Sequence, residues 1–511
     1  MERALLSTFD KTGLAELARG LAELGVELVA SGGTAEHLDE HGIDTMRVEE
    51  LTEIPELLGG RVKTLHPRIH AAILARRDHP DDLAALDEHD IRPFDLVCVN
   101  LYPFTQVASR HGVREEDAVE MIDIGGPSML RAAAKNFAHV APLCRPERYG
   151  SVLAELREAG TLSLETRRAL AAEAFAVTAA YEAAIAHWFG DREPFPELLI
   201  PSFEKVTDLV YGENPHQRAA YYAEAGVRRH LLSRVQQLHG RQLSFINLYD
   251  LNAGRMLLQE FTVPACAIIK HANPSGVAVA GTIEEAYEKA LACDPVSAFG
   301  MVCVVNRPVS AELGHRLAER FVDVLLAPEY DEEGLEALRQ KPATRILVDR
   351  ERRRFDAGER DYKRVFGGLL VQDRDWDVQG RENMEVVKGS PTEDQWGDLL
   401  FAWRVCKHVW SNAIVLAKGL QTLGIGGGQT SRVDSTRIAI EKAREHGHEL
   451  EGSVLASDAL IPFADGPQLA LDAGVRAIIQ PGGAKRDAEV IEAVESAGAT
   501  MVFTHRRHFR H

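Results

Sequence analysis

A lysine and a histidine stand side by side where an apolar stretch ends, in IIKHANPSGVAVA at residues 268–280. Two adjacent basic side chains, Lys270 and His271, at the end of a buried-looking strand raise the question of a functional site. An Asn-Pro and a Ser-Gly follow directly, as they do after a strand. The pattern fits equally an ordinary strand end with a solvated lysine and a histidine in a loop.

A second group of polar residues lies in the N-terminal part of the chain. In ELVASGGTAEHL, residues 31–34 connect a strand-like run to a helix-like run. Glycines let an anion approach the backbone, and hydroxyl and helix N–H groups donate to it, which is typical of a phosphate site. A structural turn fits the same four residues. The segment GGRVKTLHP then adds Arg61, Lys63 and Thr64, which fit either a phosphate- or carbonyl-binding loop or a solvated basic loop.

Three more side chains in this region are suited to moving protons. Tyr102 in NLYPF directly follows a strand-like run, at the sheet edge where α/β sites collect. Asp123 in IDIGG precedes two glycines, and Lys135 in AAAKN follows about one helix length later. With Lys63, these groups would transfer protons around a polarised carbonyl, provided that the fold brings them together.

Metal chemistry is not expected from the histidines. His66 and His70 have the spacing of a metal-binding pair on a helix, but Pro67 between them opposes a regular helix that spans both. The chain also has no HxE motif followed by PCxxC, so a zinc deaminase site is not expected.

Composition narrows the class of protein. A chain of 511 residues with 45% hydrophobic and 26% charged residues is an ordinary globular protein of about two to four domains. Its formal charge of -19 repels nucleic acids and anionic membranes, so a phosphate ligand would need local cations and backbone donors. The six cysteines include no CxxC pair and lie mostly in apolar runs, which is typical of reduced thiols in a cytoplasmic protein. No apolar leader and no membrane-spanning run is visible.

The order of the elements predicts an α/β protein. Strand-like and helix-like runs alternate from RALLSTF to FDLVCVNLY, which indicates a parallel sheet with helices on both faces. A helical run ends near residue 190, and the proline-interrupted residues 191–205 are the best domain boundary. Two further α/β regions follow in a similar order, which suggests an internal duplication.

These motifs occur in the order of one known family. The series runs DKTGL, LVASGGTA, GGRVKTLHP, NLYPF, IDIGG, AAAKN, YGENPHQ, KHANPSG, IGGGQTSR, SDA and RHFRH. Over essentially its whole length, the chain resembles the bifunctional purine biosynthesis family that joins phosphoribosylaminoimidazolecarboxamide (AICAR) formyltransferase to inosine monophosphate (IMP) cyclohydrolase. The resemblance implies an N-terminal methylglyoxal-synthase-like doubly wound parallel sheet at residues 1–195. It implies a C-terminal pair of cytidine-deaminase-like α/β subdomains without zinc at residues 200–511, roughly 200–375 and 376–511.

The resemblance also implies the two reactions. A formyl group passes from 10-formyltetrahydrofolate to the 5-amino group of AICAR, and the resulting formyl-AICAR closes to IMP with loss of water. The implied partners are these small molecules alone, with neither nucleic acid nor membrane, and the folate is a co-substrate. The implied enzyme is a cytoplasmic homodimer without a catalytic metal, in which a monovalent cation is possible.

Site residues follow from the resemblance motif by motif. In the cyclisation site, Lys63, Tyr102 and Asp123 would be catalytic and Lys135 the proton donor or acceptor. The nucleotide would bind Lys11, Ser31, Gly32, Gly33, Thr34, Arg61, Lys63, Thr64, Asn100, Asp123 and Ile124. In the formyl-transfer site, Lys270 would stabilise the transition state, His271 would be the base and Asn412 would orient the reacting group. AICAR and folate would bind Tyr211, His271, Gly300, Asp323, Asn412, Arg432, Val433, Asp465, Ala484, Lys485 and Arg507.

Three positions depart from the family pattern. Val210 stands where an arginine is usual, Leu460 where an aromatic residue is usual, and Phe9 where a small serine is usual. These changes bear on affinity rather than on reaction type. They leave open an alternative interpretation, in which the first domain is a phosphate-sensing regulatory module, as in carbamoyl phosphate synthetase, joined to a degenerate folate or nucleotide binder. The predicted proton-transferring residues argue against it.

Overall fold

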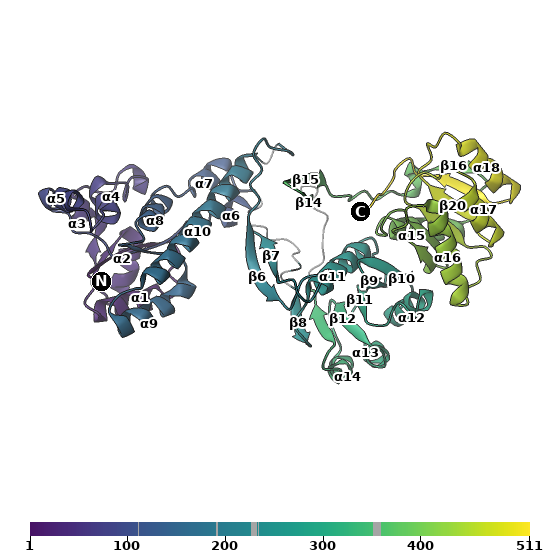
Figure 1. The fold of residues 1–511 in the computed structure, drawn as a ribbon, viewed down its shortest axis with the longest axis horizontal. Helices are drawn as coiled ribbons and strands as arrows, with labels where there is room; N and C mark the ends of the chain where they lie inside the picture. The colour runs from purple at the N-terminus through teal and green to yellow at the C-terminus, as the bar shows by residue number, and fades with distance from the viewer. Residues whose placement is uncertain (111, 191–192, 226–231, 233–234, 351–358) are drawn as a thin grey trace. The chain divides into compact units, whose positions relative to one another are not determined.

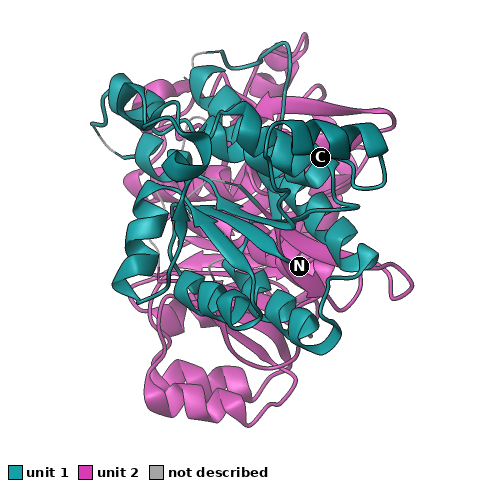
Figure 2. Ribbon diagram, turned by 90° about the vertical axis from the view of Figure 1, so that its left-hand side faces the viewer, with its two compact units in different colours: residues 1–204, 224–227 teal, residues 205–223, 228–511 magenta. Residues whose placement is uncertain are grey.

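The computed structural model describes residues 1–110, 112–190, 193–225, 232, 235–350 and 359–511, and it divides into two compact units. Unit 1 comprises residues 1–204 with 224–227, and unit 2 comprises residues 205–223 with 228–511 (Figures 1 and 2). The ribbon β6 (Phe203–Leu209) and β7 (Ala219–Glu224) lies where the chain passes between them. The limits of the functional domains stay predictions.

Unit 1 contains the expected parallel sheet. Its strands are β1 (Arg3–Thr8), β2 (Glu27–Ala30), β3 (Met46–Arg47), β4 (Leu96–Asn100) and β5 (Ala141–Leu143), in the order β3-β2-β1-β4-β5 and all parallel. The order reverses between β1 and β4. In doubly wound sheets, ligands bind beyond the carboxyl ends of the strands at such a reversal.

Helices cover both faces of this sheet. One apolar core joins the sheet to α1 (Leu14–Glu23), α2 (Gly32–Glu40) and α9 (Tyr149–Ala159). A second core on the other side joins it to α3 (Val48–Thr52), α4 (Pro67–Leu74) and α8 (Gly125–Lys135). As predicted from Pro67, α4 begins at the proline, and His66 caps it from outside. The remaining helices are α5 (Pro80–Glu88), α6 (Phe104–Ala108), α7 (Glu115–Val119) and α10 (Leu164–Gly190).

Helix α10 packs along α8 through apolar side chains, and Figure 1 shows the two helices side by side. It is also long and apolar enough to cross a membrane, by length and composition only. A single helix of this kind is weak evidence for a membrane span.

Unit 2 is built on one mixed sheet of twelve described strands. Their order is β16-β21-β20-β19-β17-β18-β10-β9-β11-β12-β13-β8. Read outward from the central β10–β18 pair, both halves have the same order of strands. The first half comprises β8 (Gln236–His239), β9 (Ala265–Lys270), β10 (Asn273–Val279), β11 (Met301–Val305), β12 (Val322–Ala327) and β13 (Arg345–Val348). The second comprises β16 (Glu385–Lys388), β17 (Ile414–Lys418), β18 (Gln421–Gly426), β19 (Val454–Ser457), β20 (Ala477–Gln480) and β21 (Thr500–Phe503).

The helices repeat in the same way. On one face, α11 (Phe245–Leu258) and α15 (Glu393–Cys406) share a single apolar core. On the other face, α12 (Ile283–Cys293), α13 (Ala311–Ala318) and α14 (Glu332–Arg339) cover the first half. The second half is covered by α16 (Arg432–Glu445), α17 (Asp465–Asp472) and α18 (Asp487–Ser496). The hairpin of β14 (Arg360–Val365) and β15 (Gly368–Asp373) lies outside this sheet.

The two halves match residue for residue near their hairpins. Lys270 pairs with Asn273 across the first hairpin and Lys418 with Gln421 across the second, a separation of 148 residues (418 minus 270). Both hairpins shift register at the same place, before Gly276 and Gly424. At each of these glycines an added Cβ would lie about 2 Å from a helix carbonyl oxygen, so neither position admits a side chain. The suspected internal duplication is therefore present in unit 2.

Candidate active sites

Asn100 joins the carboxyl ends of β1 and β4 in unit 1. Its Oδ1 accepts hydrogen bonds from the N–H groups of Phe9 (2.6 Å) and Asp10 (2.9 Å), and its Nδ2 donates to the Asp10 carbonyl oxygen (2.8 Å). The amide orientation is therefore fixed by backbone groups. Asn100 thus shapes the loop after β1.

The predicted SGGT phosphate loop forms the start of α2. Ser31 precedes the helix, and its hydroxyl lies 2.8 Å from the Ser7 hydroxyl. Thr34 accepts hydrogen bonds at Oγ1 from the Thr8 N–H (3.0 Å) and from the Lys11 ammonium (3.1 Å). Burial lowers the pKa of Lys11. The loop thus presents a helix N-terminus and a lysine side chain at the reversal point of the sheet, which is an arrangement suited to an anion.

Lys63 and Thr64 lie over two different helix N-termini. A Cβ added to Gly32 would lie 2.1 Å from Lys63 Nζ, so this ammonium lies against the first turn of α2. A Cβ added to Gly125 would lie 2.5 Å from Thr64 Oγ1, which places Thr64 against the first turn of α8. The ammonium of Lys63 also contacts Glu56 at 3.0 Å. Arg61 instead forms an exposed ion pair with Glu120.

Tyr102 and Asp123 complete this site. Asp123 accepts a hydrogen bond of 2.8 Å from the Gly126 N–H at the start of α8, and its own N–H donates to the Tyr181 hydroxyl. Burial raises the pKa of Asp123. Burial also raises the pKa of Tyr102, with a further increase from the Asp123 charge and an opposing effect of Lys63. The charges of Lys63 and Asp123 both act on the Tyr102 phenol, and the two groups lie at the N-termini of α2 and α8.

The departing residue Phe9 lies on the same side. Its ring packs edge-on against Tyr102, with 5.4 Å between the ring centroids, and about half of its surface is exposed. Ile124, the residue before α8, is exposed beside Asp123.

Within unit 1, Lys135 does not lie beside the group of Lys63, Tyr102 and Asp123. It is the last residue of α8, whereas Asp123 lies just before the first, so the two are separated by about 15 Å along the helix axis. Lys135 instead lines a cavity of about 710 Å³ with Arg131, Arg168 and Phe175. Its predicted role as proton donor or acceptor stays a prediction.

In unit 2, the predicted catalytic pair forms the end of β9 and the turn into β10. Lys270 Nζ donates hydrogen bonds to the carbonyl oxygens of Phe299 (2.8 Å) and Gly300 (3.4 Å). His271 and Ala272 make the two-residue turn, both with positive φ (53° and 58°), and the His271 side chain is exposed. The ammonium is therefore held against the sheet edge while the imidazole faces outward.

Asn412 reaches the same edge of the sheet from the second half. The turn at His271 lies at the start of β10, and because β18 is antiparallel to β10, the end of β18 and the start of β17 lie there too. Asn412 lies two residues before this start. A hydrogen bond of 2.9 Å from the Trp410 N–H to Asn273 Oδ1 connects the two halves at this point.

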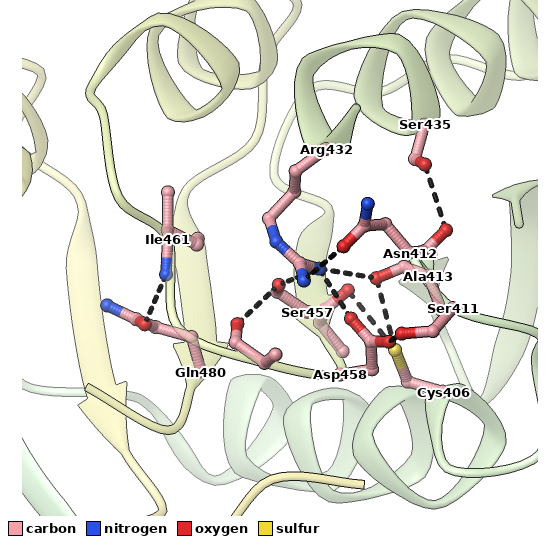
Figure 3. Close-up of polar contacts among 12 residues, drawn as sticks. Cys406, Ser411, Asn412, Ala413, Arg432, Ser435, Ser457, Asp458, Ile461 and Gln480 are labelled. Carbon is pink, nitrogen blue, oxygen red and sulfur yellow. Dashed lines mark hydrogen bonds and ion pairs between the residues drawn. The ribbon is translucent and has the colours of Figure 1, made fainter. Parts of the chain in front are cut away.

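A polar network holds Asn412 in one orientation (Figure 3). Its Oδ1 accepts a hydrogen bond of 2.7 Å from Arg432, and its Nδ2 donates to the Gln429 carbonyl oxygen (2.9 Å). Arg432 forms an ion pair with Asp458, which is fully buried, and donates to the Ser457 hydroxyl (2.9 Å). Sequence reasoning missed Asp458, although it lies in the SDA motif.

The remaining predicted ligand residues divide between the two halves. In the first half, Gly300 precedes β11 and Asp323 lies at the start of β12, where it binds Arg345 (2.5 Å) and Asn247 (2.7 Å). The Tyr211 carbonyl oxygen accepts a hydrogen bond from Phe245 at the start of α11. The second half supplies Val433 in the first turn of α16, Asp465 at the start of α17, Ala484 and Lys485 after β20, and Arg507, whose guanidinium lies over Phe509.

Comparisons with known proteins identify the family of the chain. Residues 133–442 match the family described as AICARFT/IMPCHase bienzyme, and residues 13–128 match the MGS-like domain. The "Bifunctional purine biosynthesis protein PurH" of Persephonella marina is 47% identical over 514 residues, which cover 100% of this chain and 99% of that protein. A solved structure, "Crystal structure of ForH", is 41% identical with a TM-score of 0.33, covering 37% of this chain and 99% of that chain.

Proposed function

The chain belongs to the AICARFT/IMPCHase bienzyme family and is a bifunctional enzyme of purine biosynthesis, an AICAR formyltransferase and IMP cyclohydrolase; we propose how its residues divide between the two reactions. The last two steps of IMP synthesis are formyl transfer and ring closure. Family membership sets aside the alternative of a regulatory phosphate sensor joined to a degenerate binder.

Ring closure is assigned to unit 1. The carboxamide nitrogen of formyl-AICAR attacks the formyl carbon of the same molecule, and water leaves. In the proposal, Asp123 takes the proton from the attacking nitrogen, while Lys63 and Tyr102 polarise the formyl oxygen and protonate it to a hydroxyl group. A second proton, lost from a ring nitrogen, then lets this oxygen leave as water. The observation that carries this assignment is the convergence of Lys63, Tyr102 and Asp123 between the N-termini of α2 and α8. Holding both reacting groups in one cleft supplies much of the rate advantage.

The nucleotide phosphate is assigned to the start of α2. Backbone N–H groups and the positive end of a helix favour a phosphate there, and Lys11 adds a cation. In the proposal, the ligand contacts Lys11, Ser31, Gly32, Gly33, Thr34, Arg61, Lys63, Thr64, Asn100, Asp123 and Ile124. Lys135 stays a candidate proton donor or acceptor whose position at the far end of α8 needs a separate test.

Formyl transfer is assigned to unit 2. The amine of AICAR attacks the formyl carbon of the donor, the bond from that carbon to the folate nitrogen breaks, and the folate nitrogen gains a proton. In the proposal, His271 takes the proton from the attacking amine and Lys270 stabilises the oxyanion. The Asn412 amide has one N–H left to orient a carbonyl oxygen, because Arg432 and Gln429 engage its other groups.

The substrates of formyl transfer are assigned to both halves of unit 2. A formyltransferase of this family takes its formyl group from a folate, and we assign that donor as 10-formyltetrahydrofolate. AICAR and this folate would contact Tyr211, His271, Gly300, Asp323, Asn412, Arg432, Val433, Asp465, Ala484, Lys485 and Arg507. Among the described residues, no group of three or more histidine, cysteine or acidic side chains is placed to hold a metal ion.

A cytoplasmic homodimer completes the proposal. All six cysteines are unpaired and buried, which supports a reducing compartment. Analytical ultracentrifugation of the full chain, with and without added potassium, tests the oligomeric state and the effect of a monovalent cation.

Two ultraviolet assays test the assignment. The first follows IMP formation from formyl-AICAR, and the second follows IMP formation from AICAR and 10-formyltetrahydrofolate. We expect Asp123→Asn to lose activity in the first assay and His271→Ala to lose it only in the second. Normal formyl transfer by His271→Ala would refute the assignment of the base.

A further inference from the structure

The turn that carries His271 has an unfavourable backbone for its residues. A two-residue hairpin turn of this kind needs positive φ at both central positions, where glycine and asparagine are favoured. The chain places a histidine and an alanine there, with φ of 53° and 58°. Residues with a Cβ pay a conformational cost in this region, so a stabilising contact is needed to hold the turn.

Asp250 of helix α11 supplies that contact. Its side chain is 5% exposed, and its Oδ1 accepts a hydrogen bond of 2.6 Å from the Ala272 N–H. Burial raises the pKa of Asp250, while hydrogen bonds from the Ala272 and His271 backbone and the charge of His271 oppose this rise. The carboxylate therefore faces the inner side of the turn, where its backbone N–H groups point.

The duplication provides an internal comparison. Asp398 of α15 lies 148 residues after Asp250 (398 minus 250) and is likewise buried. It accepts hydrogen bonds from Gly419 (2.9 Å) and Leu420 (2.7 Å), whose φ values are 62° and 57°. The second turn thus has the same backbone and the same helix carboxylate, but a glycine where the first has His271.

The second turn also lies away from the formyl-transfer site. It connects the end of β17 to the start of β18, whereas Asn412 and the end of β18 lie at the opposite edge of the sheet. One fold element therefore occurs twice, once with the proposed base and once without it.

We propose that Asp250 is a positioning residue for formyl transfer, which holds the His271–Ala272 turn in its left-handed conformation and so directs the imidazole at the AICAR amine. The proposal rests on the assignment of His271 as the base. It predicts that Asp250 acts mainly on kcat, because the proposed substrate contacts other than His271 lie outside this turn, and that Asp398 has only a structural role.

Matched variants of the full-length enzyme separate these roles. Asp250→Asn is expected to lower kcat of formyl transfer by about tenfold to a hundredfold, since a small displacement of a catalytic group has effects of that size. KM for AICAR and for the folate should stay within about twofold, as expected when ground-state binding is untouched. Asp250→Asn and Asp398→Asn should lower the midpoint of thermal unfolding by similar amounts. Asp398→Asn should leave kcat unchanged. The double variant Asp250→Asn with Ala272→Gly should recover part of the lost kcat, because glycine adopts positive φ freely.

Several outcomes would overturn the proposal. Unchanged kcat in Asp250→Asn would remove the role, and so would an equal loss of kcat in Asp398→Asn, which would indicate a general effect of unfolding. Retained formyl transfer in His271→Ala would instead refute the proposed base itself, so the two failures are distinguishable. If Asp250→Asn alone does not accumulate as folded protein, the glycine double variant carries the kcat comparison against Asp398→Asn.

Discussion

The Arg432 guanidinium donates a hydrogen bond of 2.7 Å to Asn412 Oδ1, and this contact decides which way the Asn412 amide faces. With the oxygen engaged, the amide can offer a substrate only its remaining N–H group. The same guanidinium is neutralised by the fully buried Asp458 (Figure 3). Asp458, which is not among the predicted site residues, thus holds Arg432, which is one of them.

Removing the Asp458 charge is expected to impair formyl transfer alone. Asp458→Asn leaves the largely buried Arg432 cation without its partner, which typically costs about 3 kcal/mol of folding free energy. We expect formyl transfer to fall at least about tenfold, because the Asn412 amide loses its fixed orientation. Ring closure, assayed with formyl-AICAR, should be unchanged. Asp434→Asn is the control, since it breaks an exposed ion pair with Arg437 on the same helix; equal losses in both variants would contradict the prediction.

Two glycines in the first turns of helices of unit 1 give a matched test of the ring-closure site. Gly32→Ala places a methyl group where Lys63 Nζ now lies, so the ammonium must move away from the start of α2. We expect cyclisation to fall by about tenfold or more with little change in thermal stability, because the displaced group is the end of a flexible side chain. Gly150→Ala in the first turn of α9 meets no atom within 4 Å, lies outside the assigned nucleotide contacts, and is expected to behave like the parent enzyme. Equal activity of the two variants would refute the proposed position of Lys63.

The Asp123 carboxyl group should set the acidic limb of the pH profile for ring closure. Burial raises its pKa, and only the carboxylate takes a proton, so kcat/KM should fall with decreasing pH at a higher pH than for a solvated aspartate. The stability of the fold should change with pH in the opposite direction to the activity. A carboxyl group with a raised folded-state pKa destabilises the fold as pH rises through that pKa, so Asp123→Asn should not lower the unfolding midpoint at pH 8. Pre-steady-state cyclisation across pH 4–8 and thermal scans check both statements; a less stable Asp123→Asn at pH 8 would contradict the second.

The position of Lys135 makes a graded prediction. Because it lies about 15 Å along α8 from Asp123, Lys135→Met should lower kcat of cyclisation less than Lys63→Met does. Single-turnover conversion of formyl-AICAR by both variants checks this. A loss as large as that of Lys63→Met would contradict this prediction. It would mean that Lys135 acts at the reacting centre despite its position at the far end of α8 in unit 1.

Local sequence patterns predicted the helices and strands, but they did not predict contacts between residues far apart in the sequence. The βαβ rhythm indicated the parallel sheet, and the SGGT segment was correctly placed at a helix N-terminus. The contact between Asp250 and Ala272 joins a helix to a turn 22 residues later with no motif around the aspartate, so spacing gave no signal for it. The His271–Ala272 turn did carry a signal, because a hairpin turn without glycine or asparagine is unfavourable unless function requires it. The sequence predicted about one helix length between Asp123 and Lys135. The fold showed that this helix continues to Lys135 and places it at the end of α8, far from Asp123.

Restoring the usual aromatic residue at position 460 is expected to strengthen folate binding. Leu460 is 40% exposed and lies two residues after Asp458, at the sheet edge that carries Asn412. A phenylalanine there would offer a ring face to the folate, and such contacts contribute about 0.5–1.5 kcal/mol, so KM for 10-formyltetrahydrofolate should fall about two- to tenfold in Leu460→Phe. The kcat should not change, because the contact is equal in ground state and transition state. Val210→Arg is the reciprocal control, since it adds a cation expected to contact AICAR and should lower KM for that substrate alone. If Leu460→Phe left the folate KM unchanged, Leu460 would lie outside the folate site.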